Sequence, residues 1–112
     1  MYDKPSILPL DSVKHEQIKM ILKHYGDEHQ RIKACEELAE LQVEIFHNSS
    51  IDVIGSNDTY NKVVSEIADV YIMLEQVVKI YDIKKHDVDD AMVQKLRRTE
   101  DRILAEKERN RT

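Results

Sequence analysis

The sequence predicts an all-α fold, and three observations support that prediction. Only two glycines and two prolines occur in 112 residues, so few positions interrupt helices. Apolar residues recur at helical spacing over four segments. Acidic, serine or glycine residues stand where those segments would begin or end. The length suits one compact domain, and 41% hydrophobic with 35% charged residues is typical of a globular protein.

The first two helices are expected to follow a short extended segment. Residues 1–10 contain both prolines and predict an extended lead-in. Asp11 or Ser12 would cap the first helix, and Gly26 would end it. Asp27 would cap a second helix of about 20 residues. The apolar stripe of this second helix is expected to face the core and comprises Ile32, Cys35, Leu38, Leu41, Ile45 and Phe46.

Two more helices are expected after the clearest loop in the chain, residues 48–57. Asp58 or Thr59 would open the third helix, which is apolar around a wide arc. Such a helix belongs at the centre of a bundle or in an oligomer interface. A connector at residues 82–86 would precede the fourth helix, and Asp87 would cap that helix.

Together these elements predict a four-helix bundle in one domain, residues 11–104. Residues 105–112 are polar and are expected to form a C-terminal tail. The broad apolar face of the third helix predicts that the bundle is completed by oligomerisation. We therefore expect a homodimer or a homotetramer.

The charge pattern and the single cysteine narrow the class of protein. The net charge is −5. Residues 95–112 are basic, with seven Lys or Arg against four Asp or Glu, so residues 1–94 carry a net charge of −8. An acidic body argues against binding to nucleic acid, whose affinity depends on neutralising phosphates. Cys35 has no second cysteine to pair with, and no apolar run is long enough to cross a membrane. The first ten residues lack the apolar segment of a signal peptide. We therefore expect a cytoplasmic protein without a membrane or nucleic-acid partner.

Two carboxylate pairs interrupt the apolar pattern of the second and third helices. Glu37 and Glu40 form one pair, and Glu66 and Asp69 form the other. Residues three apart lie about 60° apart around a helix and can reach one ion. Four facing carboxylates would repel each other, and a hard divalent cation would relieve that repulsion. Oxygen ligands favour Mg²⁺, Mn²⁺ or Ca²⁺ over Zn²⁺, although spacing alone fits solvated helix surfaces equally well.

The strings around these carboxylates carry a family resemblance. Residues 36–40 read EELAE and residues 66–69 read EIAD. This combination resembles the E-E-x-x-E … E-x-x-D signature of the MazG-like superfamily of all-α nucleoside triphosphate pyrophosphohydrolases. The string QKLRRTEDR at residues 94–102 resembles the closing E-K-x-x-x-N-x-x-R stretch of that family. The likeness covers about residues 20–103 and departs at Thr99, where the family usually has Asn.

The resemblance implies a Mg²⁺-dependent hydrolase, with Mn²⁺ as an alternative ion. Members cleave a nucleoside triphosphate, often a deoxynucleotide, to the monophosphate and pyrophosphate. Carried over by position, Glu37, Glu40, Glu66 and Asp69 would be the metal ligands. Glu36 would orient or deprotonate the attacking water, although an exposed surface role fits Glu36 equally well.

The resemblance also suggests residues that would contact the substrate. Lys95 matches a lysine of the family and is expected to contact phosphate, while Arg102 matches its arginine. Arg98 lies one turn from Lys95 and could serve in place of Arg102. Gln30 and Lys33 precede the metal pair by one to two turns and could line the pocket for the base or sugar.

The sequence also fits functions other than hydrolysis. The departure at Thr99 keeps open a non-catalytic helical module of the same fold, which would sense a nucleotide or bind another protein. A purely structural dimer is a third interpretation. Glu44 and His47 form one E-x-x-H motif, but a di-iron bundle needs two such motifs, and the sequence contains no second one. The chain also lacks a glycine-rich phosphate loop, so phosphate binding would depend on metal and side chains.

Overall fold

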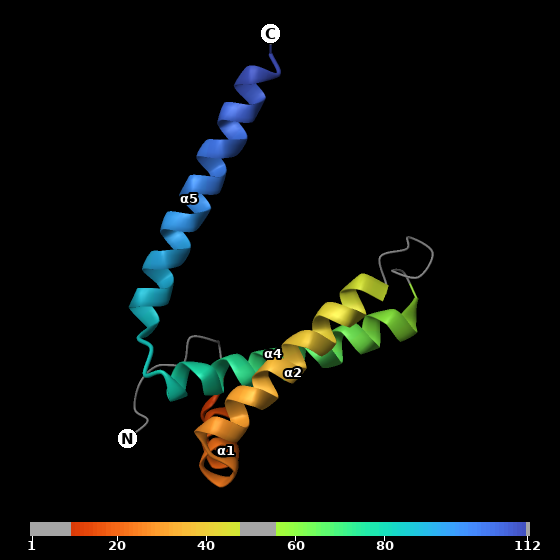
Figure 1. The fold of residues 1–112 in the computed structure, drawn as a ribbon, viewed down its shortest axis with the longest axis vertical. Helices are drawn as coiled ribbons and strands as arrows, with labels where there is room; N and C mark the ends of the chain where they lie inside the picture. The colour runs from red at the N-terminus through yellow and green to blue at the C-terminus, as the bar shows by residue number, and fades with distance from the viewer. Residues whose placement is uncertain (1–9, 48–55, 112) are drawn as a thin grey trace. The chain divides into compact units, whose positions relative to one another are not determined.

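The computed structural model describes residues 10–47 and 56–111. These residues form four α-helices and no strand (Figure 1), which confirms the all-α prediction. The helices are α1 (Ser12–Tyr25), α2 (Asp27–His47), α4 (Asn57–Ile80) and α5 (Lys85–Arg109). The chain divides into two compact units, residues 1–82 and residues 83–112, and each is described by itself. No helix in the described ranges is both long and apolar enough to span a membrane.

Helix α1 begins and ends where the sequence predicted. Asp11 is its N-cap, and the carboxylate of Asp11 accepts a hydrogen bond of 2.8 Å from the backbone N–H of Lys14. Gly26 follows the helix with a φ of 87°, a backbone conformation that glycine adopts at little cost. Its N–H donates to the carbonyl of Leu22 at 2.8 Å. Gly26 is also the single residue between α1 and α2, so it joins the two helices directly.

The starts of the next two helices differ slightly from the prediction. Asp27 is the first residue of α2 rather than its cap, and the carbonyl of Gly26 accepts the bond from the N–H of Gln30. Helix α4 begins at Asn57 because the hydroxyl of Ser56 accepts a hydrogen bond from the N–H of Thr59 at 3.1 Å. The cap therefore precedes Asp58 and Thr59, the two starts that the sequence suggested. Most of the predicted loop, residues 48–55, lies outside the described residues.

Helices α1, α2 and α4 pack together in the first unit. The most extensive contact joins α2 to α4, which run antiparallel side by side (Figure 1). Buried apolar side chains come from all three helices: Ile18, Leu22, Ala34, Val70 and Met73. This core is small, and polar residues occupy much of the contact between α2 and α4.

The face of α2 that packs against the core is not the predicted apolar stripe. The buried residues of α2 are Gln30, Ala34 and Glu37. Cys35 is exposed, Phe46 is 79% exposed, and most of the stripe is likewise on the surface. The prediction that this stripe faces the core was wrong, because polar groups of α2 find partners or neighbours on α4 and occupy the inward positions. The outward stripe forms an apolar surface around a hollow of about 350 Å³, lined by Leu38, Leu41, Gln42, Ile45 and Phe46.

The second unit consists mainly of helix α5. It begins at Lys85, two residues before Asp87, and its N-cap Lys84 makes no side-chain cap bond. Asp87 lies in the first turn, where a negative charge stabilises the helix dipole, instead of capping the helix. The helix continues to Arg109, past the point where residues 105–112 were expected to form a tail. No residue of α5 is buried.

Candidate metal centre

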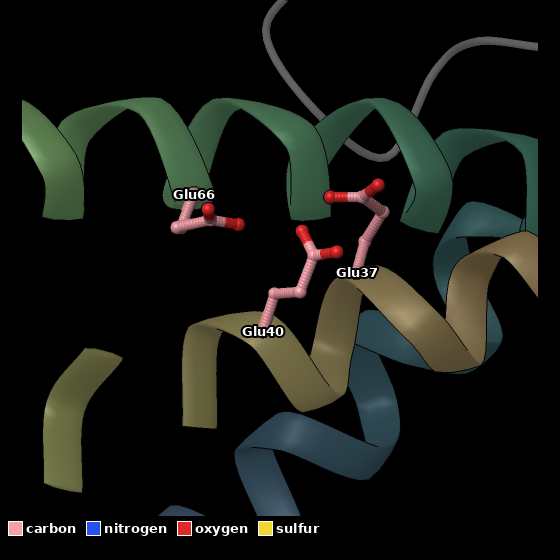
Figure 2. Close-up of side chains that lie close together, drawn as sticks. All are labelled: Glu37, Glu40 and Glu66. Carbon is pink, nitrogen blue, oxygen red and sulfur yellow. The ribbon is translucent and has the colours of Figure 1, made fainter. Parts of the chain in front are cut away.

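Three of the four predicted ligands lie together between α2 and α4. Glu37 and Glu40 lie one turn apart on α2, and Glu66 comes from the antiparallel α4. Figure 2 shows their carboxylates pointing into the same space. One oxygen from each can be chosen so that the three atoms lie within 4.8 Å of one another. These three residues are called the carboxylate cluster below.

Asp69, the fourth predicted ligand, lies beside the cluster. Burial raises the pKa of Asp69 above its ordinary value, and the negative charge of Glu37 and a hydrogen bond with it raise the pKa further. Asp69 does not belong to the group of three whose oxygens meet within 4.8 Å. The described structure thus places three carboxylates within reach of one ion and a fourth in contact with Glu37.

Two oxygens of the cluster lack a partner among the described residues. Glu37 is only 7% exposed, and its Oε2 is buried without a hydrogen bond. The Oε2 of Glu66 is buried without a hydrogen bond as well. Unpaired buried carboxylate oxygens are costly, because the charge is removed from water without compensation. A hard divalent cation would supply the missing partner, and an all-oxygen donor set suits Mg²⁺ or Mn²⁺.

Repulsion and burial raise the pKa of two carboxyl groups of the cluster, Glu40 and Glu66. The negative charge of Glu37 is the main cause that raises the pKa of Glu40. Burial is the main cause that raises the pKa of Glu66, and the charge of Glu40 adds to it. Each shift means that the folded chain holds these protons more tightly than the ordinary carboxyl does. A bound cation would reverse this tendency by favouring the charged form.

Lys33 and Glu36 lie at the edge of the cluster. The Nζ of Lys33 is 3.3 Å from Oε1 of Glu37 and 3.7 Å from Oε2 of Glu36. Its hydrogen bond with Glu37 raises the pKa of Lys33. Lys33 was predicted to line the substrate pocket, and it also provides the cluster with a nearby positive charge. Glu36 is largely exposed, so its side chain is accessible to water.

A cavity of about 450 Å³ adjoins the cluster. Its walls include the predicted pocket residues Gln30 and Lys33 together with Glu36, Glu37 and Asp69. Apolar wall residues come from α1 and α4: Ile21, Tyr25, Ile72 and Met73. The cavity therefore places an apolar compartment next to the carboxylates, within the first unit.

Two further wall residues, His29 and Gln76, have no role predicted from the sequence. Gln76 is 0% exposed, and its Oε1 accepts a hydrogen bond of 2.8 Å from Nε2 of Gln30. The signal for Gln76 was its place seven residues after Asp69, two helical turns further along the same face. His29 carried a weaker signal, its position next to Gln30.

The three predicted phosphate contacts, Lys95, Arg98 and Arg102, are exposed residues of α5. They belong to the second unit, and their role in a site remains a prediction. The hydroxyl of Thr99 donates to the carbonyl of Lys95 at 3.0 Å. Thr99 therefore uses its donor within its own helix.

Comparisons with known proteins add no assignment: no family model, curated protein or solved structure matches the chain.

Proposed function

We propose that this protein is a Mg²⁺-dependent nucleoside triphosphate pyrophosphohydrolase of the MazG-like type. It would cleave a nucleoside triphosphate to the monophosphate and pyrophosphate. The observation that carries the proposal is the carboxylate cluster, in which buried oxygens of Glu37 and Glu66 have no partner among the described residues. The adjoining cavity adds a place for the rest of the substrate.

In this proposal Glu37, Glu40, Glu66 and Asp69 hold the ion. Bound Mg²⁺ would neutralise the charge of the triphosphate and activate water. Glu36, exposed at the edge of the cavity, would orient the attacking water or accept its proton. Mn²⁺ has similar ligand preferences and could replace Mg²⁺.

The adjoining cavity would receive the nucleoside. Its volume of about 450 Å³ lies in the usual range for small-molecule sites. Apolar walls from Ile21, Ile72 and Met73 would exclude water from the base, while Gln30 and Lys33 offer polar groups. Lys95, Arg98 and Arg102 on α5 stay predicted phosphate contacts on the family resemblance alone.

Self-association is part of the proposal. The outward stripe of α2 exposes Leu38, Ile45 and Phe46, and apolar surface of this kind favours burial against a partner. We propose a homodimer or homotetramer that covers this stripe. Light scattering after gel filtration should give two or four times the 13.2 kDa chain mass. Phe46→Glu should shift the population towards monomer, and an unchanged mass would contradict this interface.

The direct test is product analysis with all common ribonucleoside and deoxyribonucleoside triphosphates in the presence of Mg²⁺. The expected products are a monophosphate and pyrophosphate. Glu40→Ala should abolish their formation, whereas Glu28→Ala, an exposed position on the same helix, should leave it unchanged. Intact nucleotides throughout the panel, or release of phosphate alone, would overturn the proposal.

A second candidate is a non-catalytic helical module that senses a nucleotide or docks another protein. The observation that favours it is Thr99, whose hydroxyl donates to its own helix backbone at the position where the resembling family has an amide. This candidate predicts Mg²⁺-dependent nucleotide binding, or protein binding, without any product. Calorimetric titration with a nucleotide that stays intact in the product assay distinguishes it from the enzyme.

A further inference from the structure

A chain of hydrogen bonds crosses from α4 to α2 beside the cavity. Nε2 of Gln30 donates to Oε1 of Gln76 at 2.8 Å, and both glutamines are buried, with 3% and 0% exposure. Oε1 of Gln30 lies 2.7 Å from Nδ1 of His29. Nε2 of Gln76 reaches the backbone carbonyl of Ile72 at 3.4 Å. The chain thus joins an imidazole at the cavity wall to a fixed backbone group.

The backbone carbonyl of Ile72 sets the direction of the whole chain. A carbonyl only accepts, so Gln76 must turn its NH₂ group towards it, and the sulfur of Met73 at 3.5 Å requires the same orientation. Oε1 of Gln76 then faces Gln30 and accepts a hydrogen bond from its Nε2. Oε1 of Gln30 is left facing His29, and only an N–H can complete that contact. The network therefore assigns the hydrogen to Nδ1 of His29.

This assignment leaves Nε2 of His29 as a hydrogen-bond acceptor when the imidazole is neutral. Within residues 10–47 and 56–111, Nε2 makes no hydrogen bond. The ring of His29 stacks on Tyr25, with centroids 5.0 Å apart and planes inclined by 18°. Both rings line the cavity. The ring is thus held by stacking and by the amide of Gln30, while one nitrogen is available to a ligand.

We propose that His29 recognises the base of the bound nucleotide by accepting a hydrogen bond at Nε2. The ligand class is a base that presents an N–H on its edge, either an exocyclic amine or a ring N–H. Gln30 and Gln76 act as positioning residues for His29, because their hydrogen bonds set its tautomer. This inference rests on the proposed function for its substrate. The tautomer itself follows from the hydrogen bonds alone.

The first experiment measures the tautomer in the ligand-free protein by ¹⁵N–¹H correlation spectroscopy of the histidine rings. The resonances of His29 are assigned by their loss in His29→Phe. A neutral imidazole in water prefers the Nε2–H form, so the Nδ1–H form predicted here is a distinctive signature. Gln30→Met should return His29 to the Nε2–H form, while Gln17→Met, an exposed control on α1, should not. A wild-type ring in the Nε2–H form would overturn the inference.

The second experiment removes the donor from the substrate. The best natural nucleotide is compared with a matched analogue: purine for adenine, 2-pyrimidinone for cytosine, hypoxanthine or 1-methylguanine for guanine, and 3-methylthymine for thymine. Loss of the donor should lower kcat/KM by up to about 10-fold in the wild type, since one hydrogen bond between the base and Nε2 of His29 is then lost. The same comparison should show little difference in His29→Phe, which keeps the stacking with Tyr25. Equal kcat/KM for both members of the pair in the wild type would overturn base recognition by His29.

The two proposals fail in different ways. If the proposed hydrolysis is wrong, the wild type gives no product from any natural nucleotide, and base recognition is overturned with it. If hydrolysis is correct and this inference is wrong, product forms equally from the matched analogue. Thermal unfolding of each variant, followed by circular dichroism, shows whether the variant is still folded. If His29→Phe does not fold, His29→Asn replaces it, because asparagine keeps a hydrogen-bond acceptor. His29→Asn should then still prefer the natural nucleotide over the matched analogue, and equal kcat/KM for the two would contradict the inference.

Discussion

The contact between α2 and α4 contains two polar layers that differ in how their hydrogen-bonding groups are satisfied. In the amide layer, Gln30 and Gln76 bond to each other at 2.8 Å, and both are almost fully buried. In the carboxylate cluster, two helical turns away on α2, buried oxygens of Glu37 and Glu66 lack partners among the described residues. Between the same two helices, one polar layer thus has its hydrogen-bonding groups paired within the chain, and the other has buried oxygens without a partner among the described residues.

This difference shows what each layer requires. Neutral amides carry donors and acceptors together, so two of them can pair and close an interface without help. Ionised carboxylates only accept, so a group of them cannot satisfy itself. The amide layer therefore stabilises the contact between α2 and α4, and the carboxylate cluster is suited to bind a cation. Four variants test this contrast, taken from the largest expected effect to the smallest.

Glu37→Gln should give the largest effect, because it removes the most buried ligand of the cluster. Under the proposed function, hydrolysis should fall by at least about 100-fold. Mutation of a residue that only hydrogen-bonds to a metal ligand costs up to about 100-fold, and loss of a ligand itself should cost more. Mg²⁺ at about 100 times its Kd should stabilise the wild type by about 2.7 kcal/mol and should not stabilise the variant. Product assays and thermal unfolding with and without Mg²⁺ measure both effects. A variant that keeps its Mg²⁺ response would show that the cluster is not the ion site.

Gln76→Leu should disturb the amide layer alone. It leaves the buried amide of Gln30 without its acceptor, which should lower the free energy of unfolding by about 1–3 kcal/mol. Its stabilisation by Mg²⁺ should persist, since the carboxylates are unchanged. Urea unfolding measures the loss, with Gln17→Leu at an exposed position of α1 as the control. Equal stability of the two variants would mean that the pair contributes nothing to the interface.

The pH dependence of metal-free protein should separate the layers further. The pKa values of Glu40, Glu66 and Asp69 are raised in the folded chain. The folded state therefore binds these protons more tightly than the unfolded state, whose carboxyls titrate near about pH 4. Their contribution to stability is present below that pH and is lost as the pH rises through the raised values.

Glu66→Gln tests this pH prediction. It should reduce the fall in melting temperature on the alkaline side of about pH 4, because it removes one titrating group and eases repulsion on Glu40. Gln76→Leu should keep the wild-type slope, since amides do not titrate. Melting temperatures between about pH 3 and pH 7 without divalent ions decide the matter. Parallel curves for wild type and Glu66→Gln would contradict the prediction.

Lys33→Met should give the smallest effect. It removes a positive charge 3.3 Å from Glu37, so metal-free protein should melt at a slightly lower temperature. Mg²⁺ should bind more tightly, by up to about five-fold, because a competing charge has gone. Isothermal titration measures this change, and Lys85→Met, whose ion pair with Asp89 lies on α5, is the control. Weaker Mg²⁺ binding in Lys33→Met would show that Lys33 supports the ion instead of competing with it.

Local signals in the sequence predicted much of the fold. Asp11 and Gly26 marked the ends of α1 correctly, because cap bonds and positive φ depend on a few neighbouring residues. Asp87 failed as a marker because an acidic residue is equally stable in the first turn of a helix. Glu37, Glu40 and Glu66 lie together as predicted. Helical spacing predicted the pair within each helix, and the family resemblance was needed to bring the two pairs together, because spacing alone fits solvated surfaces equally well.

The inward face of α2 could not be predicted from apolar periodicity. That rule places Leu38, Ile45 and Phe46 in the core, whereas the structure buries Gln30 and Glu37. Whether a polar side chain is buried depends on its partner across the interface, and that partner lies 46 residues away for Gln30. A single sequence does not show such pairing. The roles of Lys95, Arg98 and Arg102 on α5 depend on tertiary arrangement in the same way and remain predictions.

Gly26 gives the cavity a property that matters for engineering. Ile21 and Tyr25 of α1 and His29 and Gln30 of α2 lie on either side of this one residue, and all four line the cavity. The direction of α1 relative to α2, and with it the placement of these four wall residues, therefore depends on the backbone of Gly26. A Cβ at this position would meet nothing within 4 Å, so a substitution is restrained by the φ of 87° and not by space. An insertion or deletion at this junction would therefore move the cavity wall formed by α1 relative to the wall formed by α2.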